Sequence, residues 1–168
     1  NICGTIYINE VVNFELLKKA MFQFLKDNDA FRLKLSYDEK GNVKQYVSEF
    51  KRLNIDIVAL NSKDEISKLE QEMVNIPFDI INSNLFTFKM YRLPNGFGGL
   101  VLVAHHLVCD AFTTGIVANK LTSIYSALLN GEKYEGNKTS YIDYLNSENE
   151  YLKSDKFIKD KEYWNTDL

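Results

Sequence analysis

The residues with the clearest chemical potential are two adjacent histidines, His105 and His106, which leave an apolar stretch and are followed by Asp110. Neighbouring residues of a strand point to opposite faces of a sheet, so only one of the two imidazoles can face a given reacting atom. An imidazole has an unperturbed pKa of about 6.5, and as a general base it typically contributes about 10²–10⁴-fold to a rate. The pattern indicates a site where one histidine takes a proton from an attacking amine or alcohol.

The same residues also have structural interpretations. A histidine at the end of a buried strand is often a hydrogen-bonded core residue. Asp110 can be the N-cap of a helix that begins at Ala111 or Phe112, and one carboxylate oxygen can cap while the other pairs with an arginine. We expect Cys109 to be a buried filler rather than a nucleophile. Two adjacent histidines without a third ligand at a recognisable spacing predict no metal site.

A central strand must deliver the two histidines. Residues Leu100 to Ala104 are apolar at both parities, which predicts a strand in the middle of a sheet that is covered on each side. Apolar alternation or β-favouring composition predicts further strands. They lie at Ile2–Ile8, Phe31–Tyr37, Val43–Val47, Ile55–Leu60 and Phe86–Tyr91.

Helical spacing of apolar residues predicts the elements that cover this sheet. One helix is expected within Val12–Asn28 with Asn13 as its N-cap, and another within Asp64–Asn75. A third carries apolar residues at helical intervals and ends near Asn130-Gly131: Phe112, Ile116, Val117, Leu121, Ile124, Tyr125 and Leu128. One or two more follow from Ser140 to Trp164, in a tail whose Tyr and Trp side chains we expect to pack. We predict an α/β fold, a two-layer sandwich with a mixed β-sheet covered by helices.

The composition is that of an ordinary globular domain, with 168 residues, 45% hydrophobic and 26% charged. The 20 basic and 23 acidic residues are scattered, which argues against nucleic-acid binding, and no apolar run is long enough to span a membrane. Cys3 and Cys109 lack the spacing of a zinc or disulfide framework, so we expect a cytoplasmic protein. The glycosylation triplet Asn137-Lys138-Thr139 would then be accidental.

The run His105–Ala111 resembles the HHxxxDG signature of condensation domains of nonribosomal peptide synthetases, which belong to the chloramphenicol acetyltransferase-like superfamily. Other stretches resemble family segments in the family's order. They are Asn28–Leu35 ("HDALRLRF"), Pro77-Phe78-Asp79 with Leu85 ("PFDL…PL"), Tyr125–Gly131, and Ser140–Tyr144 with Tyr163-Trp164. Together they cover nearly the whole chain.

The resemblance implies a V-shaped enzyme of two similar lobes with its active site in a tunnel between them. A donor acyl thioester and an aminoacyl acceptor would arrive on peptidyl or acyl carrier proteins, each tethered through phosphopantetheine, and become joined by an amide bond. The lobe itself would bind no cofactor and no metal, and the reaction would have no covalent intermediate.

The resemblance also assigns roles to residues. His106 would deprotonate the acceptor amine, or position it and stabilise the charge that develops on attack, while His105 would be structural. Asp110 would hold the turn through an arginine, and we expect Arg32 rather than either of the other two arginines. Ala111 stands where the family has a glycine near the thioester carbonyl, so its methyl group would narrow the space in which the thioester approaches.

Residues 1–168 are expected to form the N-terminal lobe only, with the second lobe absent. A half-tunnel would leave the thioester in water and would lack acceptor contacts, so we expect the isolated lobe to be inactive or nearly so. Two alternatives remain open. One is another His-dependent acyltransferase of this fold that uses coenzyme A thioesters or alcohol acceptors, and the other is a catalytically silent lobe that docks carrier proteins.

Overall fold

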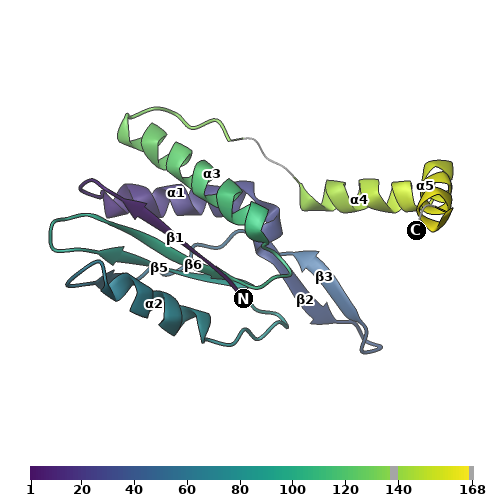
Figure 1. The fold of residues 1–168 in the computed structure, drawn as a ribbon, viewed down its shortest axis with the longest axis horizontal. Helices are drawn as coiled ribbons and strands as arrows, with labels where there is room; N and C mark the ends of the chain where they lie inside the picture. Colours follow the sequence, from purple (N-terminus) through teal and green to yellow (C-terminus); the bar gives the residue numbers. More distant parts are fainter. Residues whose placement is uncertain (137–139, 167–168) are drawn as a thin grey trace.

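A computed structural model describes residues 1–136 and 140–166, so the triplet Asn137-Lys138-Thr139 lies outside the described residues. Its main sheet has the strand order β1-β6-β5-β4 (Figure 1). The strands are β1 (Ile2–Ile8), β4 (Ile57–Ala59), β5 (Phe86–Arg92) and β6 (Gly98–Ala104). β4 pairs with β5 in parallel and the other pairs are antiparallel, which confirms the predicted mixed sheet.

Helices cover both faces of this sheet (Figure 1). Helices α1 (Phe14–Asp27) and α3 (Ala111–Leu129) pack against each other and against one face. Helix α2 (Glu65–Val74) packs against the opposite face. The α/β class is confirmed, but α2 makes a third layer where we expected two.

The central strand β6 is buried along its whole length, as its apolar sequence predicts. Leu100 and Leu102 belong to the core shared with α1 and α3, whereas Val101 and Val103 belong to the core shared with α2. Alternate side chains of β6 therefore pack against helices on opposite faces of the sheet. This double burial fixes the direction in which β6 delivers the residues that follow Ala104.

A hairpin of β2 (Leu33–Tyr37) and β3 (Val43–Val47) forms a separate two-stranded sheet. Its turn contains Gly41 at φ +80°, a conformation that glycine adopts without steric cost. We expected the first of these strands to begin at Phe31. Instead a 3₁₀ helix, η1 (Asp29–Arg32), intervenes, because residues 28 to 33 close tight turns directly after α1. β4 is likewise shorter than the predicted Ile55–Leu60.

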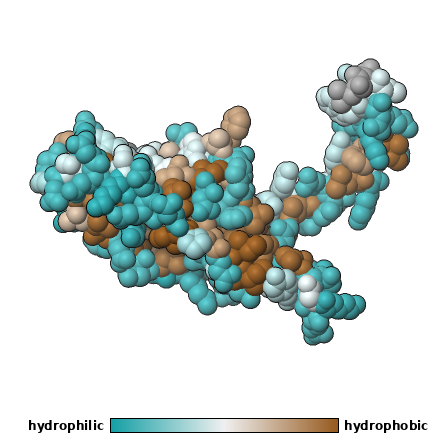
Figure 2. Space-filling view, turned by 60° about the horizontal axis from the view of Figure 1, so that its bottom comes forward, coloured by the Kyte–Doolittle hydropathy of each residue, from teal (hydrophilic) through white to brown (hydrophobic). Residues whose placement is uncertain are grey.

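Helices α4 (Tyr141–Leu152) and α5 (Asp155–Thr166) extend away from the lobe (Figure 1). Neither has a buried residue, and apolar side chains stand among polar ones along them (Figure 2). We expected this tail to pack, but Trp164 contacts Tyr163 edge-on and remains 61% exposed. Among the described residues, no helix has both the length and the apolar character needed to cross a membrane.

Candidate active site

The two histidines lie in a tight turn that follows the end of β6. The backbone N–H of His105 donates to the carbonyl of Leu85 at 2.8 Å, which ties the turn to the residue before β5. The N–H of Val108 then donates to the carbonyl of His105 at 3.0 Å. The chain thus leaves the buried sheet at Ala104 and reverses within a few residues.

The side chain of His105 takes part in holding this turn. Its Nδ1 accepts a hydrogen bond from the backbone N–H of Leu107 at 3.2 Å. The half-buried ring also meets Phe78 edge to face, with ring centroids 6.2 Å apart. These contacts occupy one ring nitrogen and pack the ring against Phe78, which leaves His105 badly placed to reach a substrate.

His106 is exposed and lines an open cavity of about 590 Å³. The cavity lies between the end of α1, η1 and the first half of α3. Its wall is largely apolar and includes Phe24, Phe31, Leu33, Ile116 and Val117. The same cavity also receives polar side chains: Asn28, Asp110, Thr113 and Lys120. An imidazole here can meet a substrate that enters from solvent.

Asp110 is the N-cap of α3, as its position in the sequence predicts. Its carboxylate accepts hydrogen bonds from the hydroxyl and the backbone N–H of Thr113, at 2.6 and 2.7 Å. These hydrogen bonds lower the pKa of the carboxyl group, and the bond from the hydroxyl has the larger effect. The turn that carries His106 is thereby joined to a capped helix.

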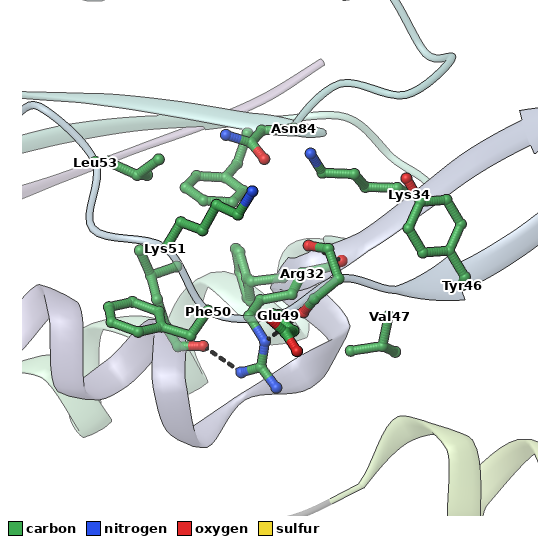
Figure 3. Close-up of a pocket in the computed structure, with 13 residues that line it drawn as sticks. Arg32, Lys34, Tyr46, Val47, Glu49, Phe50, Lys51, Leu53 and Asn84 are labelled. Carbon is green, nitrogen blue, oxygen red and sulfur yellow. Dashed lines mark hydrogen bonds between the residues drawn. The ribbon is translucent and has the colours of Figure 1, made fainter.

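The expected ion pair between Arg32 and Asp110 is wrong. The Arg32 guanidinium donates to the carbonyls of Leu25 and Lys26, both at 2.7 Å, and of Ser48 at 3.1 Å. Figure 3 shows Arg32 among the residues that line the cavity on this side of the lobe. The last carbonyls of a helix have no partner within the helix, and η1 places Arg32 beside those of α1. Arg32 therefore ties α1 to the segment after β3, at a second cavity of about 520 Å³.

The two residues on either side of Asp110 were candidates for a part in the chemistry. Cys109 is 4% exposed, and burial raises the pKa of its thiol, so it is the inert filler that we expected. Ala111 is the exposed first residue of α3. In the described part of the chain, Asn82 is the one residue other than glycine with positive φ, so Ala111 needs no conformation that alanine avoids.

Two of the apolar residues that define the helical spacing of α3 lie outside the core. Phe112 is 85% exposed and Ile116 is 53% exposed. Leu107, in the histidine turn, is 50% exposed. Only the helix face with Val117 and Leu121 is buried against the lobe. Of these exposed side chains, Leu107 and Ile116 line the cavity that contains His106.

Sequence reasoning missed the polar side chains that line the cavity together with His106. The ammonium of Lys120 donates to Oδ1 of Asn28 at 2.7 Å, although 92 residues separate the two positions. Asp29 similarly accepts from the backbone N–H of Tyr141, which brings the start of α4 to the cavity. The available signal was a lysine between the apolar positions of α3. No group of three or more metal-ligating side chains occurs in the ranges that the structure describes.

The fold and this site define a class. The condensation domain family model matches residues 1–168, and the chain belongs to that family. Surfactin synthase subunit 1 of Bacillus subtilis is 31% identical over 167 residues, which cover 96% of this chain and 5% of that protein.

Solved structures show the same fold. VibH, an NRPS condensation enzyme, aligns with a TM-score of 0.82 at 22% identity, over 99% of this chain and 39% of that one. The starter condensation domain of rhizomide synthetase RzmA aligns with a TM-score of 0.84 at 19% identity, over 99% of this chain and 42% of that one. The chain thus spans about two fifths of these structures and a small part of the synthetase.

Proposed function

We propose that this chain is the N-terminal lobe of a condensation domain that joins a carrier-bound acyl or peptidyl thioester to a carrier-bound aminoacyl acceptor. The acceptor nitrogen attacks the thioester carbonyl carbon, a C–N bond forms, and the C–S bond breaks. One proton leaves the nitrogen and one is needed by the departing thiolate. His106 is the group that takes the proton from nitrogen, or that orients the amine and stabilises its developing charge.

One observation carries this proposal. His106 projects from the end of a doubly buried strand into an open cavity, whereas His105 is engaged by Leu107 and Phe78. Since the fold fixes β6 on both faces, the turn after it presents the imidazole from a rigid support. General base catalysis requires such a positioned group within reach of the reacting proton.

The test uses the complete condensation domain that contains this chain, supplied with loaded donor and acceptor carriers. His106→Ala should lower the rate of amide formation by about 10²–10⁴-fold. His105→Ala is the matched control within the turn, and it should lower the melting temperature more than His106→Ala does. Undiminished product from the His106→Ala domain would remove this residue from the mechanism.

The same assay separates the alternative functions. Efficient use of a free coenzyme A thioester in place of the loaded donor carrier would favour a coenzyme A acyltransferase. Absence of product from the unmodified domain, with carriers still bound, would favour a silent docking lobe. The intact His106 and its open cavity argue against a silent lobe. Ala111 stands in the glycine position of the motif and does not line this cavity, and it is the departure from the motif that leaves a silent lobe possible.

We also propose that residues 1–168 alone do not catalyse the reaction. Leu107 and Ile116 are exposed in the cavity of His106, and further exposed apolar side chains lie along α4 and α5. They support a further lobe packing here, since exposed apolar surface can mark an interaction site. The space for the thioester is open to solvent on this lobe. Comparing amide formation by the lobe with that by the complete domain, at equal concentrations, tests the proposal.

A further inference from the structure

Lys120 places a positive charge in the cavity that His106 lines. It lies on α3, which packs beside α1 (Figure 1). Its single hydrogen-bond partner among the described residues is the neutral Oδ1 of Asn28, at 2.7 Å, and in those ranges it forms no ion pair with a carboxylate. A partly buried charge with only a neutral partner gains from an anion that completes its coordination.

Asn28 holds the lysine in a defined place. The Nδ2 group of Asn28 donates to the carbonyl of Phe24 at 2.7 Å, and its backbone N–H donates to the same carbonyl at 3.0 Å. These bonds fix the side-chain amide with Oδ1 turned toward Lys120. An ammonium carries three donors, so this contact leaves two of them for other partners. The charge is therefore positioned rather than free to leave the cavity.

The spacing along α3 places Lys120 on the wall that leads from His106. Asp110, Thr113, Val117 and Lys120 recur at three- and four-residue intervals, and all four line the cavity. Ten residues of helix correspond to about 15 Å along the axis. The apolar side chains between these two ends would contact an extended acyl chain. An acceptor amine, which is readily protonated, would be repelled by the ammonium.

We infer that Lys120, held by Asn28, is a specificity-determining residue that binds an oxyanion of the acyl donor while the donor carbonyl lies at His106. This inference rests on the proposed function. Two sources share the chemistry: a carboxylate at the far end of the acyl group, or the phosphate of the tether that delivers it. The bond to the ammonium would be charge-assisted, and such bonds are about twice as strong as neutral ones.

The experiment measures kcat/KM of the complete condensation domain for paired donors. Each pair has an acyl chain ending in a carboxylate and its isosteric primary amide, and chain length increases through the series. Every donor is presented both on its carrier and as an N-acetylcysteamine thioester, which lacks the phosphate. The acceptor carrier is the same throughout.

Lys120→Gln removes the charge and retains a donor for Asn28, and Lys120→Met removes both. Lys133→Met removes one positive charge from an exposed side chain that does not line this cavity. Thermal unfolding of each variant establishes that it is folded. If Lys120→Met fails to fold, Lys120→Gln carries the test.

If the carboxylate is bound, the preference for carboxylate over amide should fall by about 10-fold or more in both Lys120 variants, on both tethers, and should persist in Lys133→Met. If the phosphate is bound, the Lys120 variants should lose rate on carrier-bound donors relative to N-acetylcysteamine donors, whatever the chain end. If the Lys120 variants change neither the preference for carboxylate over amide nor the preference for carrier-bound over N-acetylcysteamine donors, the inference is overturned. Lys120 then only stabilises the end of α1. Loss of all turnover in His106→Ala, with Lys120 variants unaffected, would contradict this inference alone.

Discussion

The carboxylate of Asp110 accepts two hydrogen bonds from Thr113, at 2.7 Å from its backbone N–H and at 2.6 Å from its hydroxyl. The cap lies four residues after His106, so it stabilises the end of the segment that presents the imidazole. An N-cap contributes to the stability of its own helix, whereas an ion pair would couple Asp110 to an arginine elsewhere in the fold. Substitutions of Asp110, of Thr113 and of Arg32 therefore distinguish an N-cap from an ion pair.

Asp110→Ala should lower the melting temperature of the complete domain, because the first turn of α3 loses its acceptor. Asp110→Ser should recover most of the loss, since serine is also a favourable N-cap. Thr113→Val removes the hydroxyl donor alone and should have the smaller effect. Thermal unfolding measures all three. Equal losses in the alanine and serine variants would contradict the capping role.

The cap should also show in the pH dependence of stability. Hydrogen bonds from Thr113 hold the pKa of Asp110 below its ordinary value. The unfolded chain therefore binds this proton more readily, and the stabilisation is present above the ordinary carboxyl pKa. It is lost as the pH falls through the lowered pKa. Unfolding of the native and Asp110→Asn domains between neutral and acid pH should show their difference shrinking on the acid side, and a constant difference would contradict the assignment.

The corrected position of Arg32 predicts that it acts independently of Asp110. Arg32→Met should destabilise the domain by about 1–3 kcal/mol, because it leaves carbonyls at the end of α1 without their donor. A double-mutant cycle with Asp110→Ala should be additive within error, as expected for residues that share no contact. Arg32→Lys, which lacks the planar fork, should recover only part of the stability. A strong coupling energy between Arg32 and Asp110 would instead support an ion pair between them.

Features that depend on a short stretch of chain could be predicted from the sequence. The strand β6 and the N-caps at Asn13 and Asp110 are of this kind, because each depends on neighbouring residues or on a period along the chain. The partner of Arg32 could not be predicted, because it depends on how η1 turns the chain beside the end of α1.

Exposure of the site could be predicted only in part. Helical spacing put Phe112 and Ile116 on a helix that covers the sheet, yet the spacing cannot say which side of an apolar helix packs against the lobe. The contact between Asn28 and Lys120 joins elements far apart in sequence and required the packing of α1 on α3. The sequence indicated the chemistry of His106, but it could not predict the cavity that His106 lines.

The methyl group of Ala111 should limit the reaction more than it limits folding. Ala111→Gly should cost at most about 1 kcal/mol of stability, since glycine weakens the helix it begins. If the methyl group narrows the approach of the thioester, the same variant should raise kcat/KM for bulky acyl donors more than for small ones. Ala111→Val is the opposing variant and should reverse that order. Equal effects on all donors would remove Ala111 from the approach.

Gly99 in β6 tests the strand that precedes the histidine turn, and Gly115 in α3 is the matched control. A Cβ at Gly99 would overlap the carbonyl oxygen of Ile6 and approach the Tyr91 hydroxyl, which donates to that same oxygen at 3.0 Å. Gly99→Ala should therefore destabilise the domain by about 1–3 kcal/mol or more, because the backbone of β6 must shift against β1. A Cβ at Gly115 in α3 meets nothing within 4 Å, so Gly115→Ala should stabilise the helix by about 0.5–1 kcal/mol. Chemical denaturation measures both, and amide formation should fall in Gly99→Ala because the turn after Ala104 moves with the strand. Opposite signs for the two substitutions are expected, and a tolerated alanine at 99 would mean that β1 and β6 are not paired as described.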